Sequence, residues 1–135
     1  MALMIGVPDT GLWILATLVS FVLGYVWYSD MLFGKQWRKA AKPKKPYVDK
    51  LTVTAMSLFS TAVIAWALYF IVFSVGASNF IEGAVVAFYV WLAFFATTSL
   101  SRVLWEGTSF RVFLINSAYN LLSLVLMGAI LATGM

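Results

Sequence analysis

Residues 51–74 read LTVTAMSLFSTAVIAWALYFIVFS, a run without a single charged side chain. A helix needs about 20 mostly apolar residues to cross the hydrocarbon core of a bilayer, so this run is long enough to span a membrane. Three further stretches meet the same criterion, at residues 11–30, 81–101 and 111–132. The sequence therefore predicts a single domain over residues 1–135, an all-α integral membrane bundle of four transmembrane helices.

The composition agrees with this class and argues against several kinds of chemistry. The chain is 63% hydrophobic and 10% charged, whereas a soluble domain is about half apolar and about a quarter charged. It contains no cysteine and no histidine, which removes thiol chemistry, disulfides, haem ligation by histidine and the usual zinc sites. No carboxylate lies deep in a predicted span. We therefore expect no enzymatic activity, no cofactor and no metal ion.

All nine Lys and Arg residues lie in or beside two of the predicted connections. Seven are in the loop at residues 34–50, and the other two, Arg102 and Arg111, flank the connection between the third and fourth spans. An even number of spans places both connections on one side. The positive-inside rule therefore predicts that both are cytoplasmic and that both termini lie outside the cytoplasm. The net charge of +4 thus indicates membrane topology rather than nucleic-acid binding.

The segment at the end of the first span, WYSDMLFGKQW at residues 27–37, is rich in aromatic residues, which are typical of the interface between lipid and water. Beyond Phe33 the pattern predicts a short amphipathic helix that lies in this interface and ends at Pro43. Its cationic face should attract anionic lipid headgroups by about 1 kcal/mol for each residue. The residues predicted to contact headgroups are Lys35, Arg38, Lys39 and Lys42.

Asp30 lies at the same predicted boundary as Arg102 and Arg111. We predict that its carboxylate pairs with one of these two arginines across the bundle. A pair that is partly removed from water should then show a coupling between the two side chains in a double-mutant cycle.

Polar residues in the spans form narrow stripes at helical spacing, in the half of the membrane nearest the basic connections. An amide that faces lipid has no hydrogen-bond partner, so we expect the stripes of the second and fourth spans to face the inside of the bundle. Two interpretations remain open: hydrogen bonds that hold the helices together, and a polar cavity that opens to the cytoplasm and is closed on the outside by apolar residues. The polar stripes are Asn116, Tyr119, Asn120 and Ser123 in the fourth span, Thr54, Ser57 and Thr61 in the second, and Thr97 and Thr98 in the third.

Three motifs rich in aromatic and small polar residues lie in the first, third and fourth spans: Gly24-x-x-Trp27-Tyr28-Ser29 with Phe33-Gly34-Lys35-x-Trp37, Trp91-Leu92-x-Phe94-x-x-Thr97-Thr98, and Ile115-Asn116-x-x-Tyr119. Their pattern resembles the domain-of-unknown-function-1761 family of small bacterial membrane proteins. The resemblance implies a four-helix fold in the bacterial plasma (inner) membrane, and it transfers no activity. Where the family usually has proline after the Trp-Tyr-Ser, this chain has Asp30.

Two functional classes fit the sequence. One is a small homo-oligomeric protein that binds a solute or lets it permeate, with the polar cavity on the cytoplasmic side. The other is a structural or accessory subunit of a larger membrane complex, without a ligand of its own. Small residues at helical spacing, such as Gly83 with Ala87 and Gly128 with Ala132, let helix backbones approach closely and suit either class.

Overall fold

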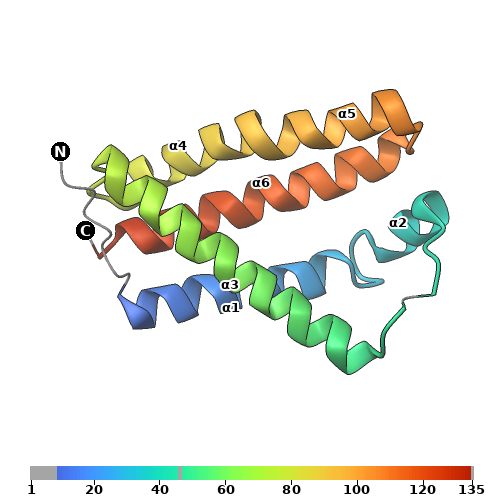
Figure 1. Ribbon diagram of the computed structural model, residues 1–135, viewed down its shortest axis with the longest axis horizontal. Coiled ribbons are helices and arrows are strands. Elements are labelled where there is room, and N and C mark those ends of the chain that lie inside the picture. The colour runs from blue at the N-terminus through green and yellow to red at the C-terminus, as the bar shows by residue number, and fades with distance from the viewer. Residues whose placement is uncertain (1–8, 46, 135) are drawn as a thin grey trace.

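The computed structural model describes residues 9–45 and 47–134, and all the regular secondary structure in this part of the chain is helical (Figure 1). Four helical segments are long and apolar enough to cross a membrane, and they coincide with the four predicted spans. The predicted all-α membrane fold is therefore confirmed. The spanning segments are Thr10–Trp27, Lys50–Val75, Phe80–Glu106 and Phe110–Ala132.

The first span is α1 (Thr10–Trp27), and a turn then leads into the short helix α2 (Gly34–Ala41). The second span is α3 (Lys50–Val75) and the fourth is α6 (Phe110–Ala132). The third span changes its hydrogen-bonding pattern along its length, from α4 (Phe80–Val90) through the π-helical segment η1 (Trp91–Ala96) to α5 (Thr97–Glu106).

Several helix ends follow directly from the local sequence. The Asp9 carboxylate accepts a hydrogen bond from the Leu12 amide and caps α1 (3.1 Å), and the Asn79 side chain caps α4 in the same way through the Glu82 amide (3.0 Å). Such side-chain caps satisfy amides that have no partner within the helix. Gly76 and Gly107 end α3 and α5 with φ angles of 86° and 68°, a left-handed conformation that glycine adopts without steric cost.

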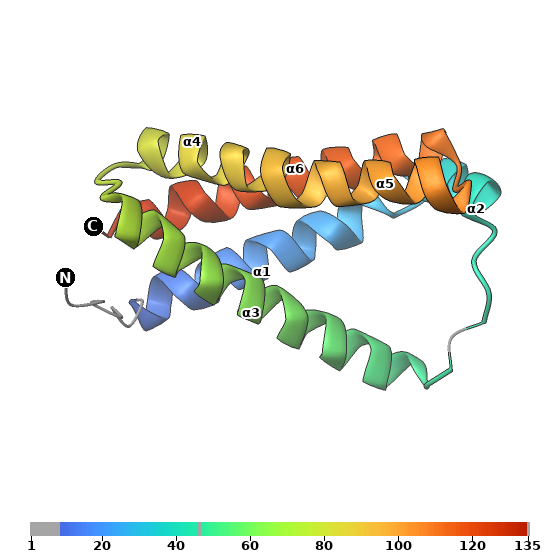
Figure 2. The ribbon, with the colours of Figure 1, turned by 45° about the horizontal axis from the view of Figure 1, so that its top comes forward.

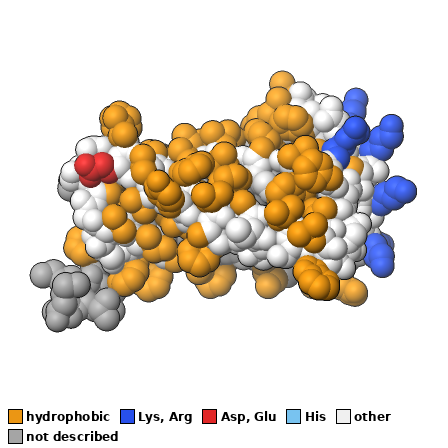
Figure 3. All heavy atoms as spheres, turned by 90° about the horizontal axis from the view of Figure 1, so that it is seen from above, with side chains coloured by type: hydrophobic (Ala, Val, Ile, Leu, Met, Phe, Trp, Pro, Cys, Tyr) orange, Lys and Arg blue, Asp and Glu red, His pale blue; other side chains and the backbone are white. Residues whose placement is uncertain are grey.

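Helix α6 is the central element, because it packs against α1, α3 and α4. Successive spans run antiparallel, so α2 and both basic connections lie at the same end of the molecule (Figures 1 and 2). Figure 3 shows the Lys and Arg side chains of one face gathered there. We call this the basic end. The connection between α3 and α4 lies at the opposite end.

Two glycines let α4 and α6 pack closely against each other. A methyl group built on Gly83 would overlap the carbonyl oxygen of Gly128, and one built on Gly128 would lie 2.6 Å from the carbonyl oxygen of Gly83 and 2.8 Å from the Ala87 Cβ. Small residues at this spacing let two backbones touch, which increases van der Waals contact between membrane helices. The close packing expected at Gly83, Ala87, Gly128 and Ala132 is present.

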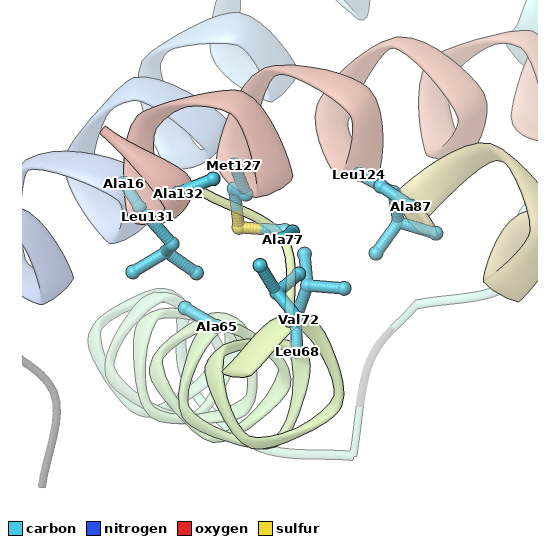
Figure 4. Close-up of a cluster of buried hydrophobic side chains, with 10 residues drawn as sticks. All are labelled: Ala16, Ala65, Leu68, Val72, Ala77, Ala87, Leu124, Met127, Leu131 and Ala132. Atoms are coloured by element: carbon cyan, nitrogen blue, oxygen red, sulfur yellow. The ribbon is translucent and has the colours of Figure 1, made fainter. Parts of the chain in front are cut away.

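The buried apolar core lies beside this contact, and α3 reaches it only with its second half. Figure 4 shows Ala65, Leu68 and Val72 of α3 turned toward Met127 and Leu131 of α6. Side chains that interlock in this way exclude lipid, and their close contacts stabilise the bundle through dispersion.

The first half of α3 diverges from the bundle. Helix α1 meets α3 where the Trp13 indole N–H donates a hydrogen bond to the Ala62 carbonyl (2.9 Å). Toward the basic end the two helices separate (Figures 1 and 2). All of residues 51–60 are exposed except Thr52, which is half-buried. The basic half of α3 therefore has little protein around it.

Candidate functional site

The first motif forms a tight turn between α1 and α2. The amides of Phe33 and Gly34 donate hydrogen bonds to the carbonyls of Trp27 (3.0 Å) and Ser29 (2.9 Å), and these bonds fold the chain back on itself. Gly34 is buried, and a methyl group built on it would overlap the Tyr28 carbonyl oxygen. A side chain at residue 34 would therefore prevent the turn, which accounts for the glycine of the motif.

Aromatic rings fill the inside of this turn. The Trp27 and Phe33 rings lie 4.6 Å apart, and the Tyr28 ring meets the Trp37 ring edge-on at 5.7 Å. Tyr119 of α6 completes the group, with its ring 5.5 Å from that of Tyr28. Edge-to-face and tilted arrangements of this kind are favourable for aromatic pairs. The turn and α2 are therefore held to α6 by aromatic packing.

Three hydrogen bonds join the same groups to α6. The Tyr28 hydroxyl donates to the side-chain oxygen of Asn116 (2.6 Å), and the Trp27 indole N–H donates to the Ile115 carbonyl (3.2 Å). The Tyr119 hydroxyl donates back to the Ser20 carbonyl of α1 (3.0 Å). The motifs of the first and fourth spans thus meet in one site.

We call this site the signature cluster. A methyl group on Gly24 would lie 2.8 Å from the Tyr119 hydroxyl oxygen, so the glycine leaves the room that the tyrosine needs. The indole N–H of Trp37 is buried and has no acceptor in the described part of the chain. The cluster consists of Gly24, Trp27, Tyr28, Phe33, Gly34, Trp37, Asn116 and Tyr119.

The polar stripe of α6 is divided between different neighbours. Ser123 is buried and its hydroxyl lies 2.5 Å from that of Ser20 in α1, while Tyr119 and Asn116 belong to the signature cluster. These three residues act as interhelical hydrogen-bonding groups. Asn120 is half-buried, and no hydrogen bond of its side chain is found within residues 9–45 and 47–134.

The stripes of the second and third spans do not meet that of α6. The Thr54 and Thr61 hydroxyls each donate to a carbonyl of α3 itself, one turn back (2.9 Å in both cases). Thr97 and Thr98 are exposed and bond in the same way to the Ala93 and Phe94 carbonyls. Thr97 and Thr98 therefore face the surroundings of the bundle, and Thr54 and Ser57 of the second span, whose stripe is predicted to face its inside, are exposed as well. A hydroxyl bonded to its own helix satisfies its donor without a neighbouring helix.

The motif of the third span coincides with a π-helical segment. Trp91 and Phe94 lie in η1, and Thr97 is the first residue of α5. The Trp91 indole N–H donates to the Ser117 carbonyl of α6 (2.9 Å) and fixes this segment against the bundle. Short π-helical segments interrupt α-helices frequently at functional sites. The pattern of residues 81–101 predicts a spanning helix but not this change in its hydrogen bonding.

Asp30 has a different partner from the one predicted. Its carboxylate forms an ion pair with Arg38 of α2, and Arg102 pairs with Glu106 within α5 at 3.4 Å. The reason is local, because the turn at residues 28–33 brings α2 back toward the end of α1. The nearby guanidinium of Arg38 lowers the pKa of the Asp30 carboxyl. Both side chains are exposed, so water screens this pair.

Helix α2 occupies the segment predicted to be amphipathic and ends at Ala41, just before Pro43. The charged side chains predicted to contact headgroups, those of Lys35, Arg38, Lys39 and Lys42, are all exposed. Trp37 and Ala41 are half-buried on the other side of the helix. The apolar face of α2 is turned toward the bundle, where Trp37 packs on Tyr28, and its cationic face is exposed at the basic end.

Comparison with known proteins places the chain in a family. None of the curated proteins and none of the solved structures matches it. A family model matches residues 12–132, a range that holds all three motifs and most of each of the four spans. The chain therefore belongs to the family of proteins of unknown function DUF1761.

Proposed function

We propose that the protein is a small homo-oligomeric membrane protein that binds a polar solute, or lets it permeate, between α3 and α6 in the basic half of the bundle. The proposal is supported by the position of the polar residues, which lie on the faces of α3 and α6 that pack in the core further along, in the half where α3 diverges from the bundle (Figure 2). The positive-inside rule predicts that this half is the cytoplasmic one.

The polar residues of α3 lie on the face that packs in the core further along. Thr54, Ser57 and Thr61 precede Ala65, Leu68 and Val72 at intervals of three or four residues, which places all six on one side of a helix. The second three are buried in the core. Thr54 and Ser57 are exposed, and Thr61 is half-buried. Thr54 and Ser57 are therefore exposed because α3 diverges from the bundle, and not because they lie on a different side of the helix from the core residues.

Asn120 has the same position on α6. It precedes Leu124, Met127 and Leu131 at helical spacing, and these three are buried in the core with α3. Its half-buried amide has two donors and an acceptor and makes no hydrogen bond within the described residues. An amide at this depth needs a polar partner, and water or a solute between the helices would supply one.

A second copy of the chain would close this space on its lipid side. Exposed apolar side chains flank the polar face of α3 at helical spacing, among them Leu51 (77% exposed) and Leu58 (37%). A neighbouring helix packed on them would separate the polar groups from lipid. The same surface also favours the accessory-subunit function, in which a helix of a different protein fills the space and contacts the polar groups directly.

Single cysteines test the proposal, because the natural chain contains none. Ser57→Cys should react from the basic side with a membrane-impermeant thiol reagent in native membranes. Met56→Cys is the matched control, since the neighbouring residue points about 100° further round the helix toward the surrounding lipid and should not react. Equal reactivity at the two positions would contradict a polar space beside Ser57.

The mass of the purified protein separates the two functions. A stable symmetric oligomer in mild detergent, together with a reactive Ser57→Cys, supports solute binding or permeation. A fixed foreign partner that cross-links to Ser57→Cys and blocks its labelling supports the accessory subunit. Asn120→Leu should abolish solute uptake while it leaves the oligomer intact, and unchanged uptake would contradict the proposed path.

A further inference from the structure

A small pocket at the basic end, between α5 and α6, has the chemistry of an anion site. Its volume is about 130 Å³, far below the several hundred cubic ångströms of a pocket for a drug-sized molecule. The pocket therefore has room for one small polar group. It is lined by Ser99 and Arg102 of α5, Thr108 of the connection, and Val112, Phe113 and Asn116 of α6.

The polar side chains around the pocket are rich in hydrogen-bond donors. The Arg102 side chain is 68% exposed and uses its Nε for Glu106 at 3.4 Å. Its two terminal nitrogens make no hydrogen bond within the described residues. Asn116 uses its side-chain oxygen to accept the bond from Tyr28, which leaves both N–H groups of its amide as donors. The hydroxyls of Ser99 and Thr108 can also donate. The lining thus offers several N–H and O–H groups to one acceptor-rich ligand.

The charge of the pocket favours an anion as well. Val112 and Phe113 belong to the first turn of α6, a helix of 23 residues whose N-cap residue, Ser109, makes no side-chain hydrogen bond to the helix end. The free amides and the helix dipole give this end a partial positive charge. Together with Arg102 they outweigh Glu106, whose carboxylate limits how much negative charge the pocket accepts. A singly charged oxyanion therefore fits better than a doubly charged one.

The surroundings indicate the depth of the pocket in the membrane. Trp105 is 89% exposed and Phe110 is 57% exposed, and they stand just before and just after the connection that borders the pocket. Exposed aromatic side chains at a helix end are typical of the headgroup level. A phosphodiester, which carries one negative charge and several acceptor oxygens, is the most abundant oxyanion at this level.

We infer that this pocket binds a single phosphate group, that of a phosphodiester in a lipid headgroup. The site is separate from the lysines of α2, which are exposed on a different element and offer only a surface charge. It is also separate from the proposed solute path, whose polar residues lie on α3 and at Asn120.

Binding of a soluble short-chain phosphatidylglycerol to the full chain in detergent tests the inference. Short-chain diacylglycerol is the control without phosphate, and inorganic phosphate is the control without lipid. Native mass spectrometry of the natural chain reports binding. Phosphatidylglycerol should bind at least tenfold more tightly than diacylglycerol. Inorganic phosphate that competes with equal affinity would instead identify free phosphate as the ligand of the same pocket.

Two pocket variants and one outside it give the decisive comparison. Arg102→Gln removes the guanidinium, and Asn116→Asp keeps an acceptor for Tyr28 while it replaces the amide donors with a negative charge. Each should weaken phosphatidylglycerol binding at least tenfold with the helical circular dichroism unchanged. Lys50→Gln removes one charge at the same end outside the pocket and should change affinity less than threefold. Equal weakening in all three variants would show attraction by surface charge only and overturn the inference.

Discussion

The Tyr28 hydroxyl donates a hydrogen bond to the side-chain oxygen of Asn116, 2.6 Å away, and so joins the end of the first span to the fourth. The bond is partly buried and spans 88 residues of sequence. A bond of this kind between two membrane helices contributes about 0.6 kcal/mol on average and up to about 1.7 kcal/mol. It fixes where the turn before α2 sits against the bundle.

Tyr28→Phe should therefore lower the free energy of unfolding by about 1 kcal/mol, because Asn116 loses its donor while the aromatic packing remains. Tyr25→Phe is the control, since Tyr25 is 79% exposed and should change stability little. Unfolding in a denaturing detergent, followed by circular dichroism, measures both variants. Equal stability of the two would show that the Tyr28 bond contributes nothing.

Gly83→Val should destabilise the protein by about 1–3 kcal/mol or more, because its side chain would overlap the Gly128 carbonyl and the Ala132 methyl group. Ala67→Val adds atoms to an exposed position of α3 and serves as the control. The same unfolding measurement applies. A Gly83→Val protein as stable as the control would contradict the close backbone contact between α4 and α6.

Cysteines at Ser78 and Lys44 should react with an impermeant thiol reagent from opposite sides of the membrane. Ser78 is exposed at one end of the molecule and Lys44 lies in the basic loop at the other. The neighbouring Ala77 is 6% exposed, so a cysteine there would be shielded. Labelling of both residues from the cytoplasm would rule out a four-span topology.

The pKa of the Asp30 carboxyl should rise in Arg38→Gln, because the nearby guanidinium lowers it in the natural chain. Since folding lowers this pKa, the pair stabilises the protein above the pKa of the unfolded carboxyl. That stabilisation disappears as the pH falls through the lowered value. Titration by NMR with labelled aspartate measures the shift. Arg102→Gln should leave it unchanged, and a shift in that variant instead would support the pairing predicted from the sequence.

The four spans could be predicted from the sequence because length and hydropathy alone determine which segments suit a bilayer. The starts of α1 and α4 also coincide with residues that favour helix N-caps, Asp9 and Asn79. Membership of the family followed from short motifs, and the structure adds that residues of two of them, Tyr28 and Asn116, touch.

The divergence of α3 could not be predicted, because lipid and a protein core are equally apolar and the pattern of residues 51–74 is the same in either surrounding. The π-helical segment at Trp91 arises from a local shift in backbone hydrogen bonding that leaves no periodic signal. The partner of Asp30 depends on the turn that Gly34 permits. The positions of charged residues along the predicted spans do not predict this turn.

Helix α3 is packed in the core only from Ala65 onward. Core contacts fix the second half of the helix. The part from Ala65 back to Lys50 is about 22 Å long at 1.5 Å per residue. A rotation of the helix by about 10° about Ala65 would move Lys50 by about 4 Å. Because residues 51–60 are almost all exposed, this rotation would break few contacts, and we expect it to cost little free energy. We therefore expect the first half of α3 to be more mobile than its second half, and that mobility would change the distance between the second and fourth spans at the basic end.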